Sequence, residues 1–156
     1  MKKLILAALC LLAVSAQAQV QTLTVNNWNP TCDVYFTLRG NPSGGGCSAS
    51  HRSSLQVFVP GQTATFDAGS VPGGMNCGSC TPTTLAAGDD IVVARILDAN
   101  PLLGCTVTGA GVVGDPCFTG TTSITYTIQN STCAACGSVT VVWTSTGPGA
   151  ASLDFY

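Results

Sequence analysis

The sequence predicts an all-β fold: a single antiparallel β-sandwich of the immunoglobulin-like type, stapled by disulfides. Apolar and polar residues alternate with a period of two in several segments, as in strands that bury one face. Turn residues separate these segments at short intervals, which is typical of sandwiches. Eight cysteines follow residue 19, and no window beyond the N-terminal segment has the periodicity of an ordinary helix.

The N-terminal segment, residues 1–18, has the parts of a secretory signal peptide. Lys2 and Lys3 precede an apolar stretch over 4–14, and Ala16 and Ala18 are the small residues that a signal peptidase reads. The apolar stretch is shorter than the roughly 20 residues that span a bilayer, so we expect cleavage and no transmembrane anchor. Cys10 follows the bulky Leu9 rather than a small residue, and we expect it to leave with the signal.

The remaining residues, 19–156, are enough for one domain with one core. Their basic residues are Arg39, Arg52 and Arg95, set against seven aspartates, which gives a net charge of −4. So few cations predict no basic patch. This argues against nucleic acid and anionic membranes as partners.

The first half of the domain contains four expected strands, over 23–25, 33–39, 54–59 and 63–67. In 33–39 the apolar residues at even positions face the core, and in 54–59 those at odd positions do. Tyr35 and Phe58 are therefore expected to point outward. Pro60-Gly61-Gln62 predicts a turn that closes a hairpin between the third and fourth of these strands.

The second half contains four more, over 91–97, 123–128, 139–144 and 151–156. The segment 91–97 is apolar almost throughout except for Arg95, so we expect a central strand that is covered on both faces. The other three alternate and bury one face. Long stretches rich in Gly, Pro and Ser, over 41–50, 68–84 and 100–120, are expected to be irregular.

The even number of cysteines in an exported domain indicates up to four structural disulfides. The cysteines are Cys32, Cys47, Cys77, Cys80, Cys105, Cys117, Cys133 and Cys136. Sequence does not fix their connectivity. We favour the local pairs Cys32–Cys47, Cys77–Cys80, Cys105–Cys117 and Cys133–Cys136, the last lying across the turn between two strands.

Two Cys-x-x-Cys motifs, at Cys77 and at Cys133, also match a zinc site or a redox dithiol. However, 52 residues lie between Cys80 and Cys133, whereas a zinc ribbon separates its pairs by about 15–20. Neither motif begins a helix that would lower a thiol pKa. We therefore expect no metal and no cofactor.

The residues for catalysis are also sparse. His51 is the only histidine, follows a glycine-rich segment and neighbours Arg52, so we interpret it as a surface residue. No nucleophile elbow of the G-x-S-x-G type is present. Asp89 and Asp90 follow Gly88, which suits a turn. The sequence therefore predicts a protein that is not an enzyme and has no catalytic residues.

The candidate ligand surface is aromatic. Trp28, with Tyr35 and Phe58 pointing outward, could form a platform for a glycan or a protein patch. The alternative, which we favour, is that Trp28 closes one end of the sandwich.

Several motifs occur in an order that resembles small exported cysteine-rich bacterial β-sandwich proteins with no assigned function. They are Cys32-Asp33-Val34, Pro60-Gly61-Gln62 with Phe66, the strand 91–98, Gly114-Asp115-Pro116-Cys117, and Cys133-Ala134-Ala135-Cys136-Gly137 leading to Trp143. The resemblance implies export and the fold, and it implies no active site.

We therefore expect a secreted or periplasmic protein that acts through its surface as an adhesive, structural or binding subunit. Alternatives are a carbohydrate-binding module, a metal or hydrolytic protein, and a filament subunit whose first or last strand, 20–25 or 152–156, completes the sheet of a neighbouring copy.

Overall fold

The computed structural model describes residues 20–156. The predicted signal peptide, residues 1–18, and Cys10 lie outside the described residues. The described part is all-β, with 48% of its residues in strands. It contains no α-helix and one short 3₁₀ turn, η1 (Pro101–Leu103). Within it, no helix long and apolar enough to cross a membrane occurs.

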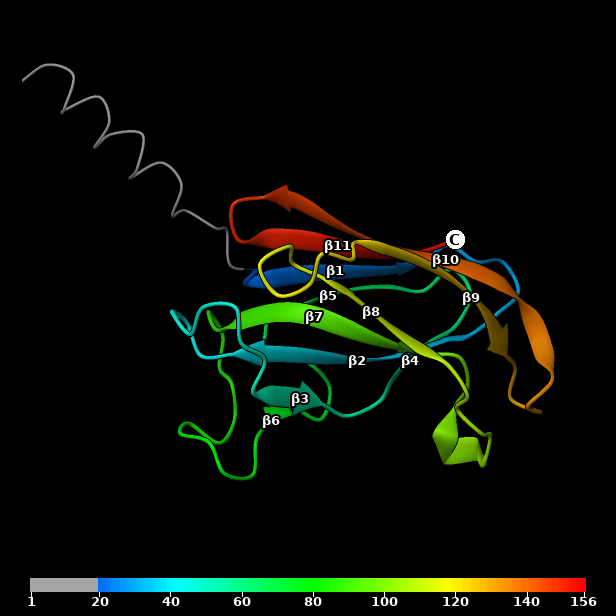
Figure 1. The fold of residues 1–156 in the computed structure, drawn as a ribbon, viewed down its shortest axis with the longest axis horizontal. Coiled ribbons are helices and arrows are strands. Elements are labelled where there is room, and N and C mark those ends of the chain that lie inside the picture. The colour runs from blue at the N-terminus through cyan, green and yellow to red at the C-terminus, as the bar shows by residue number, and fades with distance from the viewer. Residues whose placement is uncertain (1–19) are drawn as a thin grey trace, which may run out of the picture.

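The strands form two sheets (Figure 1). The first has five strands in the order β5 (Thr63–Phe66), β1 (Thr22–Asn27), β11 (Ala150–Phe155), β10 (Ala135–Gly147) and β9 (Ser123–Gln129). In the second, the order is β6 (Met75–Asn76), β3 (His51–Ser53), β2 (Val34–Asn41), β7 (Asp90–Leu97) and β8 (Ala110–Gly114), and β4 (Gln56–Phe58) pairs with β2.

One strand pair departs from the predicted antiparallel arrangement. β1 and β11 pair in parallel along their whole length, from Thr22 opposite Ala150 to Asn27 opposite Phe155. Both strands are interior, because β1 also pairs with β5 and β11 with β10. The two segments expected as strand donors, 20–25 and 152–156, are thus already paired within this chain.

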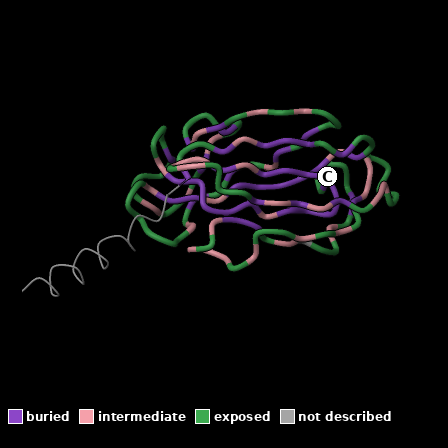
Figure 2. The backbone as a smooth tube through the Cα atoms, turned by 90° about the horizontal axis from the view of Figure 1, so that it is seen from above, coloured by how far each residue is buried: buried purple, intermediate pink, exposed green. Residues whose placement is uncertain are grey.

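Aromatic side chains from both sheets meet in one core. The Phe36 ring lies 5.6 Å from that of Phe155 in the opposite sheet, and Phe58 lies 6.1 Å from Phe66. Figure 2 shows that buried residues follow the strands, whereas the connections are mostly exposed. Burial of such rings is the main source of folding free energy in a domain of this size.

The segment 54–59 has the opposite orientation to the predicted one. Phe58 lies opposite Val34 on the core face of β2 and is 3% exposed, whereas Val57 and Val59 are 38% and 52% exposed. Because side chains alternate along a strand, a one-residue error in register exchanges the two faces. Pairing with β2 determines which face of this segment is buried. The sequence pattern could not determine it, because both faces carry apolar residues.

The predicted hairpin at Pro60–Gln62 is also wrong, although the turn exists. β4 pairs with β2 in the six-stranded sheet, whereas β5 pairs with β1 in the other. The turn therefore carries the chain from one sheet to the other. Gly61 has a φ of +76°, which glycine adopts without steric cost.

The central-strand prediction is confirmed. β7 lies between β2 and β8, and seven of its eight residues are buried, with only Arg95 intermediate. Three short strands that the sequence did not predict, β3, β6 and β8, lie in or beside the glycine-rich stretches. They are two to five residues long, too short for a period-two pattern to be recognised.

All eight cysteines form disulfides, but only Cys77–Cys80 has the predicted partner. The other three bridges are Cys32–Cys136, Cys47–Cys117 and Cys105–Cys133. The local pairs are wrong because the fold brings together segments separated by 104, 70 and 28 residues. Instead of bridging their own turn, Cys133 and Cys136 connect it to two segments that flank strands of the six-stranded sheet.

These separations predict unequal contributions to stability. By the chain-entropy model, loss of Cys32–Cys136 should lower the free energy of unfolding by about 4–5 kcal/mol, and loss of Cys77–Cys80 by about 2 kcal/mol. Chemical denaturation of the paired Cys→Ser variants, C32S/C136S against C77S/C80S, measures both. Equal losses would contradict this ranking.

Candidate functional site

The predicted aromatic platform does not form. Trp28 is 55% exposed, but Tyr35 is fully buried and Phe58 is 3% exposed in the core, so the three rings share no surface. The favoured alternative is also wrong, since Trp28 closes nothing and lies on the surface. Its indole Nε1 donates a 3.3 Å hydrogen bond to Asp154 Oδ1.

His51 is not a surface residue. It lies on β3 and is fully buried. Its Nε2 lies 2.8 Å from the Pro82 carbonyl oxygen, so this nitrogen carries the proton, and its Nδ1 then accepts from the Ser50 hydroxyl at 2.9 Å. A ring without solvent contact, hydrogen-bonded on both sides, is out of reach of a substrate.

All three arginines of the described chain lie on one face of the six-stranded sheet. Arg39 on β2 is directly opposite Arg52 on β3, and Thr37 on β2 is directly opposite Arg95 on β7. Cross-strand partners share a face, as do residues two apart. This face points away from the core, because Phe36 and Leu38 occupy the other side of β2. We call it the arginine face. The sequence-based expectation of no basic patch is corrected here, because strand pairing gathers cations that are 13 to 56 positions apart.

The arginine face is unusually poor in internal partners. Within residues 20–156, no hydrogen bond or ion pair is formed by any of the three guanidinium groups. Four consecutive outward residues of β2 each have a buried side-chain polar atom without a hydrogen-bond partner: Tyr35 Oη, Thr37 Oγ1, Arg39 Nε and Asn41 Oδ1. Buried polar atoms are normally paired. Burial and the nearby Asp33 raise the pKa of Tyr35, so its hydroxyl keeps its proton.

The edges of the arginine face are apolar. Val57 lies opposite Tyr35 and Val112 opposite Arg95, and each valine is 38% exposed. Arg52 is exposed, whereas Arg39 and Arg95 are half-buried. The face therefore combines cationic donors with exposed apolar side chains.

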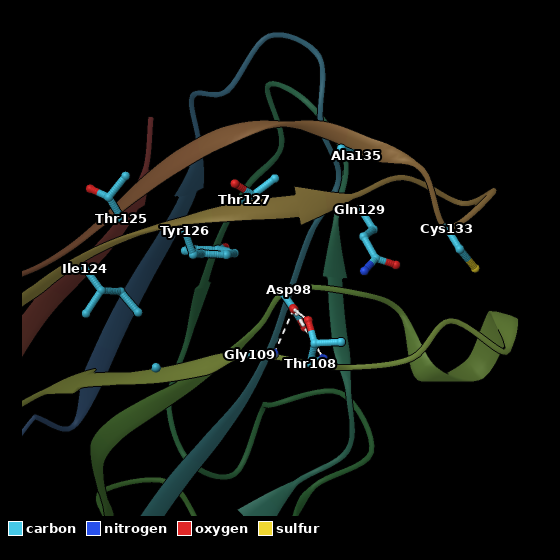
Figure 3. A pocket seen from close by; sticks show the side chains of 11 residues that line it. Asp98, Thr108, Gly109, Ile124, Thr125, Tyr126, Thr127, Gln129, Cys133 and Ala135 are labelled. Carbon is cyan, nitrogen blue, oxygen red and sulfur yellow. Dashed lines mark hydrogen bonds between the residues drawn. The ribbon is translucent and has the colours of Figure 1, made fainter.

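A second site is a cavity of about 610 Å³ between β9 and the segment that joins β7 to β8. Tyr126 and Gln129 extend into it from β9, facing Asp98, Thr108 and Gly109 (Figure 3). The Asp98 carboxylate accepts from Thr108 Oγ1 at 2.6 Å and from the Gly109 amide at 2.8 Å. The hydroxyl of Tyr126 is buried and has no partner. Sequence reasoning placed Tyr126 on the inner face but gave no signal for this cavity.

No grouping of three or more His, Cys, Asp or Glu side chains that could hold a metal ion occurs within the described chain. No family model matches the sequence, and neither the curated proteins nor the solved structures give a match.

Asp90 provides a test of the unpaired polar atoms along the outward side of β2, because it lies beside the last of these residues. It lies opposite Asn41, is fully buried, and neither of its carboxylate oxygens has a hydrogen-bond partner. Burial, and secondarily the charge of Asp89, raises the pKa of Asp90 from 3.8 to about 6. Between these values the folded state holds a proton that the unfolded state has released, so stability should fall as pH rises through this window.

The Asp90→Asn variant should lack this fall and should be more stable than the parent at pH 7. Thermal unfolding at pH 4, 5, 6 and 7 measures it, with Asp67→Asn, in the turn after β5, as the matched control. The prediction would be contradicted if the stability of the parent and the stability of Asp90→Asn changed equally between pH 4 and pH 6.

Proposed function

We propose that this protein is a secreted, non-enzymatic binding subunit, an immunoglobulin-like β-sandwich whose ligand surface is the arginine face. The four disulfides support a location outside the cytoplasm, because such bridges persist in oxidising compartments. Two layers of strands around one core support the sandwich. The burial of His51 supports a role without catalysis.

The observation that carries the proposal is the juxtaposition of Arg39 and Arg52 without a counter-charge. Like charges directly opposite on neighbouring strands destabilise a sheet, and Arg95 adds a third cation at a diagonal position. No carboxylate within residues 20–156 relieves this repulsion by an ion pair. A bound anion would relieve it, and would therefore bind the folded state preferentially.

The ligand that fits is an acidic polysaccharide. Guanidinium groups bind carboxylate and sulfate oxygens bidentately, and three cations spaced across three strands match repeated charges along a polymer. Nucleic acid fits less well, because phosphate-backbone recognition typically uses about 6–10 cationic contacts.

Carbohydrate recognition is thus proposed on a different surface from the aromatic one. Trp28 remains available for a protein or glycan contact, but it lacks a neighbouring ring. Filament formation by strand donation has no support, because β1 and β11 each have two partners in this chain.

The test is binding of the protein to alginate and to heparin, with neutral dextran and a single-stranded oligonucleotide for comparison. The double variant Arg39→Gln/Arg95→Gln should bind both acidic polymers about tenfold or more weakly, a loss of about 1.4 kcal/mol or more. Binding of the parent should also weaken at high salt, because screening acts on exposed charges. Biolayer interferometry at low and high ionic strength measures both effects.

The matched control is Thr22→Asp/Thr144→Asp, which lowers the net charge by the same amount on exposed positions of the other sheet. It should bind nearly as well as the parent. If both double variants lost affinity equally, binding would depend only on net charge and the proposal would be wrong. Binding of dextran as tight as that of alginate would also contradict it.

A further inference from the structure

The cavity beside β9 has one feature that the folding of the chain does not explain. The Tyr126 hydroxyl is buried in its wall and makes no hydrogen bond. Leaving a buried hydroxyl unpaired costs about 1–3 kcal/mol. The cavity is within the size range of small-molecule sites, about 300–1,000 Å³.

The formal charge of the cavity wall is negative. Asp98 is its only ionisable carboxylate, and no Lys, Arg or His lines it. Asp98 is 7% exposed and has no ion pair within the described residues. Buried charges usually have a partner of opposite sign. An anionic ligand would meet repulsion here, and a cation would supply the missing partner.

Asp98 has the capacity to accept one more hydrogen bond. Its Oδ2 already accepts from Thr108 Oγ1 and from the Gly109 amide, whereas Oδ1 receives only the Thr108 amide, at 3.2 Å. An ionised carboxylate has about four acceptor positions. These bonds also fix the direction of the carboxylate, so a ligand would meet an acceptor that is already oriented.

Tyr126 contributes its ring and its hydroxyl oxygen. The ring lines the cavity, and its π face attracts a cation. Burial, and secondarily the negative charge of Asp98, raises the pKa of Tyr126 above its ordinary value. The phenol therefore stays neutral and keeps an oxygen that can accept from an N–H donor.

The rest of the wall is mainly apolar. Ile124, Ala135 and Cys133, which is bonded to Cys105, line it together with Gly111. A Cβ on Gly111 would meet Ile124 Cδ1, so a larger residue there would displace the end of the Ile124 side chain in the cavity wall. Gln129 adds a neutral amide. A ligand therefore needs an apolar body and one cationic end.

We propose that this cavity binds a small organic cation, with its ammonium group between the Asp98 carboxylate and the Tyr126 ring and its apolar part against Ile124. This site is separate from the arginine face, and neither proposal depends on the other.

The test compares three probes of nearly equal shape that differ in charge: benzylamine, benzyl alcohol and benzoate. In ¹H–¹⁵N NMR titrations of the protein at constant ionic strength, benzylamine should bind at least tenfold more tightly than benzoate and should shift the amides of Asp98, Gly109 and Tyr126. Equal affinities, or shifts confined to other residues, would overturn the proposal.

Variants separate charge from shape. Asp98→Asn keeps an acceptor for the Thr108 and Gly109 amides and removes the charge, so the preference for benzylamine over benzyl alcohol should fall to within about twofold. The control is Asp67→Asn, in the turn after β5, which lies at the edge of the five-stranded sheet opposite β9. It should keep the full preference for benzylamine over benzyl alcohol.

Tyr126→Leu and Tyr126→Phe separate ring from hydroxyl. Leucine should weaken benzylamine binding by about tenfold, whereas phenylalanine, which keeps the ring, should weaken it only about two- to threefold. These two variants keep the test decisive if Asp98→Asn does not fold. Unchanged binding in Tyr126→Leu would also overturn the assignment.

Discussion

Covalent bridges between the two sheets are the constraint on which the structure depends. Cys32, just before β2, is bonded to Cys136 on β10, and Cys105, after β7, is bonded to Cys133 at the turn before β10. Each bridge joins a segment of the six-stranded sheet to the β9–β10 hairpin of the other. They fix one end of the molecule, where the cavity lies, so the glycine-rich connections there need little core of their own. With few charges and no lysine after residue 3, the chain relies on burial and cross-links rather than ion pairs.

The arrangement separates two kinds of polar chemistry. Buried polar side-chain atoms without partners are concentrated on the outward row of β2 and at its neighbour Asp90, with the others on Tyr126 and Trp143. Proteins normally avoid such atoms because each costs stability. Apart from Trp143, they lie on or beside the arginine face or in the wall of the cavity, whose single charged residue is negative. The two candidate sites therefore differ in the sign of their charge, with arginines on one and Asp98 in the other.

Local patterns predicted much of the fold and little of the site. The strands with clear alternation, such as 139–144, and the doubly buried strand 91–97 could be predicted because their patterns follow from burial alone. The face of 54–59 could not, because Val57, Phe58 and Val59 are all apolar and only pairing with β2 selects the buried one. The same limit applies to function. Arg39, Arg52 and Arg95 are isolated in sequence, and only the register of three strands brings them together. Disulfide partners likewise depend on tertiary contacts and not on spacing.

The parallel pairing of β1 with β11 has a consequence for how the chain is made. β1 lies between β5 and β11, so its own sheet is incomplete until β11 has been synthesised. The paired residues Thr22 and Ala150 are 128 positions apart, and folds that depend on contacts of such large sequence separation form slowly. During synthesis β1 must stay without its neighbour β11. This topology favours folding of the five-stranded sheet after synthesis of β11 rather than during synthesis of the strands before it.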